Sequence, residues 1–277
     1  MEKQIWFITG ISSGLGKAIA QTALEAGHFV IGTFRRNEQV AEFNLTHAET
    51  AKAFLLDITD QVAIKKIIAE VKVQFGKIDV LVNNAGVGFV GAIEETSDQE
   101  VREVFEANFF GTLALTREVL PIMRKQNSGH IIQISSHGGI KAFAGFGIYN
   151  ASKFALEGFS EALAQEVAPL GIKVTLVEPG PFRTKFASSQ LGEAKSKIDD
   201  YNETAGSFRE KLKSVDGKQE GSPQKAAKVI VGLVENENPP LRLPLGKTPL
   251  KTISMKLESI QKDLDAASLI AQSVVYG

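Results

Sequence analysis

The chain has 277 residues, of which 43% are hydrophobic and 23% are charged, and its formal net charge at pH 7 is −1. This composition is typical of a globular protein that buries a sizeable core, and the length suits one large α/β domain. The near-zero charge, without long runs of one sign, argues against a nucleic-acid partner. The chain has no cysteine, which excludes disulfides and thiolate chemistry and favours a reducing compartment.

The sequence contains no pattern typical of a metal site or of a membrane-spanning segment. The four histidines (His28, His47, His130 and His137) show no metal-ligand spacing, so no metal site is expected. The N-terminal residues MEKQIWFITG lack the longer apolar run of a signal peptide. No stretch approaches the roughly 20 apolar residues of a membrane span. We therefore expect a cytoplasmic protein that does not bind membranes.

Short apolar runs alternate with helical patterns along the chain. The predicted strands lie at 4–9, 29–34, 51–57, 77–84, 130–135, 172–179 and 239–246. The predicted helices lie at 15–27, 60–76, 99–126, 149–168, from Ser222-Pro223 onward, and at 248–274. Strands that are apolar throughout and alternate with helices indicate a parallel sheet covered on both faces. The sequence predicts one domain over 1–277, a doubly wound Rossmann fold with about seven parallel strands and helices on both faces.

Two segments near the C-terminus differ from this core. Residues 187–221 are rich in Lys, Glu, Asp, Ser and Gly, and we expect exposed helices or a mobile flap there. Residues 248–274 have the pattern of an amphipathic C-terminal helix. No internal repeat and no long linker divides the chain.

The loop TGISSGLG (9–16) lies between the first predicted strand and the first predicted helix. Gly10, Gly14 and Gly16 permit a tight turn and a close approach of the backbone to a pyrophosphate, which the helix N-terminus attracts. The alternative to phosphate binding is that the glycines form a tight turn with a structural role only. The letters G-I-S-S-G also match the nucleophile elbow of hydrolases, but that mechanism needs a histidine late in the chain, and none follows His137.

Several motifs follow the glycine loop in a fixed order: Asp57 at the end of the third strand, NNAG at 83–86, Asn108, Ser136, and Tyr149-x-x-x-Lys153. With this set the chain resembles the short-chain dehydrogenases/reductases, in the common subtype with TGxxxGxG and YxxxK. The resemblance covers roughly residues 4–185. It is weakest over 187–221, whose counterpart in the family often covers the substrate.

The end of the second predicted strand bears on the choice of nicotinamide cofactor. Phe34 is followed by Arg35 and Arg36, and no Asp or Glu occurs at 33–37 to bind a ribose 2′-hydroxyl. A guanidinium suits a 2′-phosphate, and Ser12 or Ser13 could add a hydroxyl contact. The residues therefore favour NADP(H) over NAD(H), although the arginines could also be ordinary surface charges.

The resemblance implies a full set of cofactor contacts. Asp57 and Ile58 would meet the adenine, Asn84 would partly brace the loop, and Thr184 would contact the carboxamide. The expected cofactor-binding residues are Gly10, Ser12, Ser13, Gly14, Leu15, Gly16, Arg35, Arg36, Asp57, Ile58, Asn84, Ala85, Gly86, Tyr149, Lys153, Pro179, Gly180 and Thr184.

Tyr149 and Lys153 are four residues apart, so they share one face of a helix. A nearby ammonium favours the phenolate, and we expect it to lower the pKa of Tyr149 toward the range useful for acid–base catalysis. As an isolated pair they would be an ordinary surface pair. The resemblance makes Ser136, rather than Ser135, the group that orients the substrate oxygen, and it makes Asn108 the holder of a water that links Lys153 to solvent.

Three functions are weighed from these residues. The favoured one is a carbonyl reductase or ketoreductase that uses NADP(H) and a proton from Tyr149. A non-catalytic nucleotide-binding regulator should lack one of the four catalytic residues, and a sugar-nucleotide epimerase or dehydratase should have another glycine spacing. The substrate is a small carbonyl compound or alcohol, and the candidate pocket walls are His137, Phe143, Phe146, Phe182 and Phe186. The resemblance implies a homodimer or homotetramer that pairs through 99–126 and 149–168.

Overall fold

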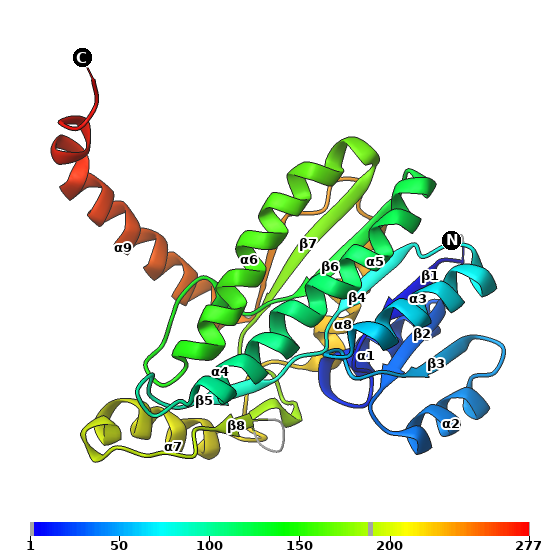
Figure 1. The fold of residues 1–277 in the computed structure, drawn as a ribbon, viewed down its shortest axis with the longest axis horizontal. Coiled ribbons are helices and arrows are strands. Elements are labelled where there is room, and N and C mark those ends of the chain that lie inside the picture. The colour runs from blue at the N-terminus through cyan, green and yellow to red at the C-terminus, as the bar shows by residue number, and fades with distance from the viewer. Residues whose placement is uncertain (1–2, 188–190, 277) are drawn as a thin grey trace.

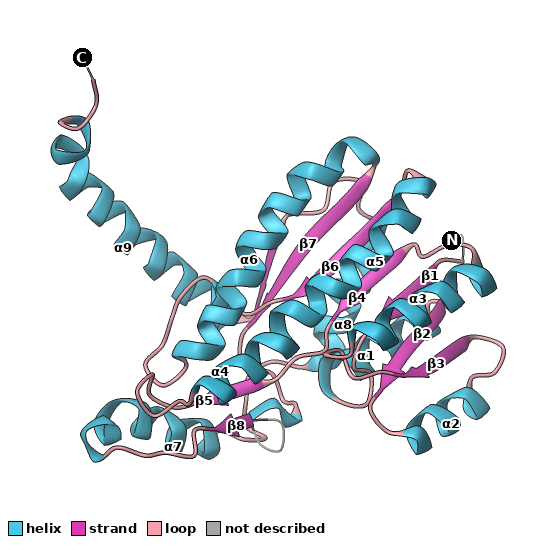
Figure 2. Ribbon diagram, in the orientation of Figure 1, coloured by secondary structure: helices cyan, strands magenta, loops and turns pink. Residues whose placement is uncertain are grey.

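The structure, a computed structural model, describes residues 3–187 and 191–276. Its centre is a seven-stranded parallel sheet with the order β3-β2-β1-β4-β6-β7-β9 (Figures 1 and 2). These strands are β1 (Ile5–Ile8), β2 (Phe29–Phe34), β3 (Ala51–Leu55), β4 (Val80–Asn83), β6 (Gly129–Ile134), β7 (Ile172–Pro179) and β9 (Arg242–Leu245). The predicted doubly wound Rossmann fold is confirmed, and the strand order reverses between β1 and β4.

Helices cover both faces of the sheet, as continuously apolar parallel strands require. The helices are α1 (Gly14–Glu25), α2 (Asn37–Thr46), α3 (Gln61–Phe75), α4 (Asp98–Phe105), α5 (Gly111–Gln126), α6 (Gly147–Val167), α7 (Ser207–Ser214), α8 (Pro223–Gly232) and α9 (Lys247–Gln272). Helices α3, α5 and α6 lie on the near face in Figure 1, and α1 and α8 pack together on the far face.

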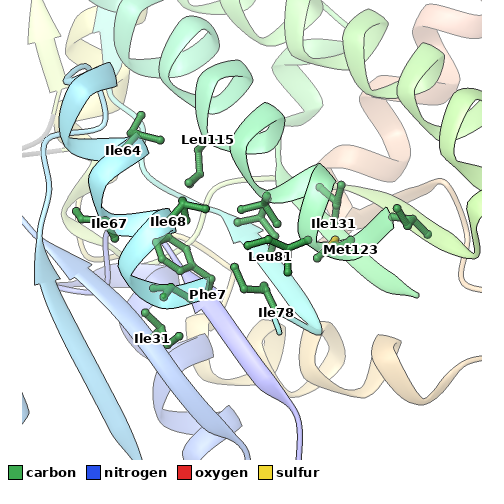
Figure 3. Close-up of a cluster of buried hydrophobic side chains, with 14 of the residues drawn as sticks. Phe7, Ile31, Ile64, Ile67, Ile68, Ile78, Leu81, Leu115, Met123 and Ile131 are labelled. Atoms are coloured by element: carbon green, nitrogen blue, oxygen red, sulfur yellow. The ribbon is translucent and has the colours of Figure 1, made fainter. Parts of the chain in front are cut away.

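The side chains of each strand alternate between two hydrophobic clusters. Phe7 on β1 enters the cluster under α3 and α5, where Ile64, Leu81 and Leu115 are fully buried (Figure 3). Its neighbours Trp6 and Ile8 point the opposite way, into the cluster under α1 and α8. The two clusters hold the sheet rigidly, and its carboxyl edge can therefore carry a precisely placed site.

Local signals fix several helix ends at the predicted places. Asp60 caps α3, because its carboxylate accepts hydrogen bonds from the N–H groups of Val62 and Ala63. Gly76 ends α3 in the left-handed conformation with φ 73°. Ser222 caps α8, and Pro223 occupies its first turn.

The predicted helix 99–126 is present as one unbroken helical run, but it is not α-helical throughout. It is formed by α4, a π-helical turn at Glu106–Phe110, and α5. The turn places Asn108 against the chain after β4, where its Oδ1 accepts from the Val87 N–H and its Nδ2 donates to the Val87 carbonyl. One extra residue in the turn accommodates this contact, as π-bulges at functional sites often do.

Three further elements, one helix and two short strands, were not predicted. Helix α2 has no fully buried residue, so its sequence shows little apolar periodicity. Strands β5 (Gly88–Val90) and β8 (Leu191–Glu193) form a separate two-stranded parallel sheet between residues that are about a hundred positions apart in the chain. No local pattern signals such a long-range pair.

The segment 187–221 was expected to form exposed helices or a mobile flap; over 191–221 most residues are exposed and α7 is present, while 188–190 lie outside the described residues. A few of its residues are buried and make contacts that the sequence did not predict. Buried Arg209 on α7 pairs with buried Glu95 at 2.9 Å. The backbone N–H of Ile198 donates to the other Glu95 oxygen, and the N–H of Lys195 donates to Glu100. These long-range polar contacts dock the segment on 88–100, although its sequence is polar.

None of the helices in the described part of the chain is both long and apolar enough to span a bilayer. The predicted C-terminal helix is present as α9, which projects from the body toward the C-terminus (Figure 1).

Candidate active site

One large cavity of about 1300 Å³ runs along the carboxyl edge of the sheet. It begins at the glycine loop after β1, crosses the point between β1 and β4 where strand order reverses, and ends against α7. This edge is where open α/β sheets bind their ligands. The predicted cofactor residues, Ser136, the Tyr149–Lys153 pair and the five predicted pocket-wall residues all line it. Asn108 does not line the cavity.

The glycine loop has the geometry of a phosphate cradle. Gly10 and Gly14 have φ values of 70° and 58°, a region that favours glycine. A Cβ on Gly16 would lie 2.3 Å from Asn84 Nδ2 and 2.5 Å from the Gly10 carbonyl oxygen, so only glycine fits. Helix α1 begins here without an acidic residue in its first turn, and its N–H groups face the cavity end. The loop therefore fits the pyrophosphate of a dinucleotide.

Charged side chains line the end of the cavity beyond the glycine loop. Arg35 and Arg36 are exposed and line the cavity directly after β2. Asp57 also lines it, and its carboxylate accepts from the N–H and hydroxyl of Thr59. Asn84 has the predicted bracing position, since its amide donates to the carbonyls of Thr9 and Gly10.

The catalytic candidates meet in the middle of the cavity. Tyr149 and Lys153 lie one turn apart on α6, and both are buried. Ser136 follows β6; its hydroxyl accepts from the Gly138 N–H and is hydrogen-bonded to Tyr149. The Lys153 ammonium lies 6.0 Å from the centre of the Tyr149 ring and donates to the Ile134 carbonyl at 2.9 Å. A hydroxyl, a phenol and an amine thus converge on one spot.

The expected lowering of the Tyr149 pKa by Lys153 is wrong for this structure. Burial raises the pKa of Tyr149 to about 12, and the hydrogen bond from Ser136 opposes this only in part. Burial also lowers the pKa of Lys153 to about 8, against the attraction of Glu157. Desolvation is the largest influence on both pKa values, and the chain alone holds Tyr149 as a protonated phenol.

Asn108 lies behind the cavity wall. Its Oδ1 accepts from Val87, and its Nδ2 donates to Val87 and to the Ser152 hydroxyl at 3.0 Å. The same Oδ1 would be 2.9 Å from a Cβ on Gly86, so glycine leaves room for the amide there. The side chain therefore braces the turn after β4 against α6, and its role in holding a water stays a prediction.

A cluster of three charged side chains, Arg242, Glu157 and Glu178, lies behind Lys153. Arg242 on β9 places its Nε 3.1 Å from Glu157 Oε2 and 3.6 Å from Glu178 Oε1, and both carboxylates are buried. Burial and the nearby Glu157 raise the pKa of Glu178 to about 7, against the effect of Arg242. Burial raises the pKa of Glu157 too.

Aromatic side chains form the other half of the cavity. The rings of Phe146 and Phe186 lie 5.0 and 5.6 Å from that of Tyr149. Phe143 stacks on Phe208 of α7 at 6.4 Å, and His137 lies 5.1 Å from Phe143. The structure thus brings four of the five predicted wall residues together, while Phe182 forms a bridge with Gly221.

Several lining residues were missed in the sequence. Phe208, Lys211, Leu212 and Val215 come from α7 and its C-terminal end, and Thr248 and Thr252 come from the base of α9. The Thr252 hydroxyl is 3.0 Å from His137 Nδ1. Phe208 and Leu212 are four residues apart in the polar helix α7, so they share one face of it. This spacing is the one local feature of the sequence that could have indicated a buried apolar face there.

Comparison with known proteins identifies the family. Residues 4–194 match the family model described as short chain dehydrogenase. The chain is 40% identical over 250 residues to a 3-ketodihydrosphingosine reductase of Bacteroides thetaiotaomicron, covering 89% of each chain. It is 36% identical to an NADPH-dependent 3-dehydrocapnine reductase of Ornithobacterium rhinotracheale, covering 71% of this chain and 70% of that one. A solved short-chain dehydrogenase from Streptomyces avermitilis is 42% identical with a TM-score of 0.93, covering 99% of this chain and 100% of that one.

This chain belongs to the short-chain dehydrogenase family, and it is an oxidoreductase of that family.

Proposed function

We propose that the protein interconverts a ketone or aldehyde and its alcohol with NADP(H) as cofactor. The observation that carries the proposal is the meeting of Ser136, Tyr149 and Lys153 between a phosphate cradle and an aromatic pocket in one continuous cavity. The two relatives named as reductases support carbonyl reduction, and one of them is NADPH-dependent.

Tyr149 is the proton donor in the direction of reduction. Its pKa of about 12 keeps the phenol protonated at neutral pH, so the proton is available for the carbonyl oxygen. Ser136, held by the Gly138 N–H, donates a hydrogen bond to that oxygen and orients it. Lys153 would hold the ribose hydroxyls of the bound cofactor and would return a proton to Tyr149 after it has given its own to the substrate. NADP(H), when bound, supplies or accepts the hydride.

The cofactor assignment rests on the end of β2. Arg35 and Arg36 line the cavity there, and no carboxylate occurs at 33–37. A planar guanidinium binds phosphate oxygens in pairs, which favours a 2′-phosphate. The glycine loop would hold the pyrophosphate and Asp57 the adenine.

The substrate is a hydrophobic carbonyl compound, because Phe143, Phe146, Phe186 and Phe208 surround the place where it would meet Tyr149. We place the enzyme in the cytoplasm, from its lack of cysteine, and expect a homodimer or homotetramer from the family resemblance.

The test is NADPH oxidation, followed at 340 nm, with a panel of ketones and aldehydes of increasing apolar size. NADH is measured in parallel, with the wild type and an Arg35→Glu variant. We expect turnover with NADPH and an NADPH-to-NADH ratio that falls at least tenfold in the variant. Tight NADPH binding without turnover on any carbonyl would contradict the reductase assignment.

A further inference from the structure

Helix α9 carries an apolar seam that the body of the protein does not cover. Apolar residues recur along it at alternating steps of three and four: Leu250, Ile253, Leu257, Ile260, Leu264, Ala267 and Ala271. Leu257 and Leu264 are 59% and 60% exposed, and all side chains from 257 to 276 are exposed. A strict seven-residue repeat of this kind is the pattern of a coiled-coil seam, narrower than the face of a core-packed helix.

The base of α9 is held firmly, so the seam has a fixed direction. Thr248 donates from its N–H and its hydroxyl to Glu220 at 3.0 and 2.9 Å. Pro249 is buried against Gly180, and the Thr252 hydroxyl contacts His137. Beyond this base the helix leaves the body and projects outward (Figure 2). A helix of 26 residues is about 39 Å long, so most of the seam is clear of the body.

We propose that α9 pairs with the α9 of a second copy of this chain as an antiparallel two-stranded coiled coil. The charges beside the seam select this orientation. Lys256 and Asp263 occupy equivalent flanking positions one repeat apart, directly before Leu257 and Leu264. In an antiparallel pair these flanking positions face each other, so Lys256 meets the partner's Asp263, twice by symmetry.

The register that pairs Lys256 with the partner's Asp263 also pairs the apolar seam residues of the two helices. It places Leu250 opposite the partner's Ala267, Ile253 opposite the partner's Leu264, and Leu257 opposite the partner's Ile260. In a parallel pair, Lys256 would face the partner's Gln261 and Asp263 the partner's Ser268, without a charge pair. Within the described residues neither Lys256 nor Asp263 forms a salt bridge in the single chain.

The arrangement of the bodies agrees with this orientation. Figure 1 shows the body of the chain at the N-terminal base of α9. In the antiparallel pair the two bodies would therefore lie at opposite ends of the coil, whereas a parallel pair would crowd both at one end. A membrane surface fits the helix less well. Its polar face mixes Lys251, Lys256 and Lys262 with Glu258, Asp263 and Asp265, and it lacks the lysine-rich face of helices that bind anionic lipid.

The first test is the mass of the full chain by analytical ultracentrifugation over a range of concentrations. The seam variant is Leu257→Asp/Leu264→Asp, and its matched control is Met255→Asp/Leu269→Asp on the outer side of the same helix, where the side chains are 46% and 83% exposed. We expect the seam variant to have half the mass of the wild type and the control to be unchanged. Equal masses for the seam variant and the wild type would overturn the proposal.

The second test examines orientation through charge. Lys256→Asp should weaken association by about tenfold, because two attractive pairs become repulsive. Adding Asp263→Lys to that variant should restore association. Failure of the double variant to restore it would overturn the antiparallel register. Flotation of the wild type with phosphatidylcholine–phosphatidylglycerol vesicles, lost in the seam variant while the mass of both proteins is that of one chain, would show a membrane partner and overturn the proposal.

Discussion

The two halves of the cavity are built in different ways. The cofactor half consists of the loops after β1 to β4, at 10–16, 33–36, 57–58 and 84–86, and each loop is short and local in sequence. The substrate half brings Phe143 and Phe146 together with Phe208 and Leu212, which are more than sixty residues away. The first half depends on backbone geometry fixed by the sheet. The second depends on the docking of a polar segment, which makes it the part free to vary with substrate.

The largest expected effect lies where the halves meet. Tyr149→Phe removes the proton donor while keeping the ring that packs against Phe146 and Phe186. We expect turnover to fall by about 10²- to 10⁴-fold and the dissociation constant for NADPH to stay within about threefold of the wild type. Steady-state rates and fluorescence titration measure the two. Unchanged turnover would remove Tyr149 from the chemistry.

The substrate half should be sensitive to its buried ion pair. Arg209→Met leaves Glu95 buried without its guanidinium, at a cost of about 3 to 5 kcal/mol for the docked segment. We expect faster amide hydrogen exchange across 191–221 and a higher KM for the carbonyl substrate, with NADPH affinity retained. The control is Lys213→Met. Lys213 lies on α7 like Arg209, but its ammonium is exposed and pairs with Glu193 on β8. Equal exchange in both variants would show that the ion pair does not hold the segment.

The cofactor half should be sensitive to added volume. In Gly16→Ala the new methyl would clash with Asn84 and the Gly10 carbonyl, and we expect unfolding to become easier by about 1 to 3 kcal/mol, with NADPH binding at least tenfold weaker. Gly158→Ala is the matched control, because a Cβ there meets no atom within 4 Å. Because residue 158 lies in the middle of α6, replacing its glycine by alanine should stabilise the protein by about 0.5 to 1 kcal/mol. Urea titration of both variants measures their free energies of unfolding. A Gly16→Ala variant as stable as the wild type would contradict the claim that only glycine fits this position of the phosphate cradle.

The cluster of three charged side chains behind Lys153 predicts a pH dependence of stability. The pKa of Glu178 is raised from 4.5 to about 7, so the folded state binds its proton more tightly than the unfolded state. Its stabilising contribution is full below about pH 4.5 and is lost as the pH rises to about 7, a change of about 1 to 3 kcal/mol. Glu178→Gln should flatten this part of the stability profile. Glu161→Gln, which alters the exposed partner of Arg242, should leave the slope in place; the reverse pattern would show that Glu178 is ionised throughout.

Much of the cofactor half could be predicted from the sequence because its signals are local. The glycine loop, the helix at 60–76 and the Tyr149–Lys153 spacing each depend on neighbours within a few residues. The parallel sheet followed from the apolar strands, and its predicted strand count was right.

The substrate half could not be predicted in the same way. The contact of Arg209 with Glu95 and the pairing of β5 with β8 join positions about a hundred residues apart. The polar composition of 191–221 hid the few side chains that are buried, such as Ala205 and Arg209. The direction of the Tyr149 pKa shift was predicted wrongly because the sequence shows the charge of Lys153 but not the depth at which Tyr149 is buried, and burial is the largest cause of the shift.

The central claim is that the phenol of Tyr149 and a nicotinamide act on one carbonyl carbon in the middle of this cavity. The most direct measurement is mass spectrometry of the alcohol formed from a hydrophobic ketone and NADPH deuterated at the transferable C4 position. We predict one deuterium on the carbinol carbon with the wild type and almost no product with Tyr149→Phe. Alcohol without deuterium at that carbon, or as much labelled alcohol from the variant as from the wild type, would contradict the account.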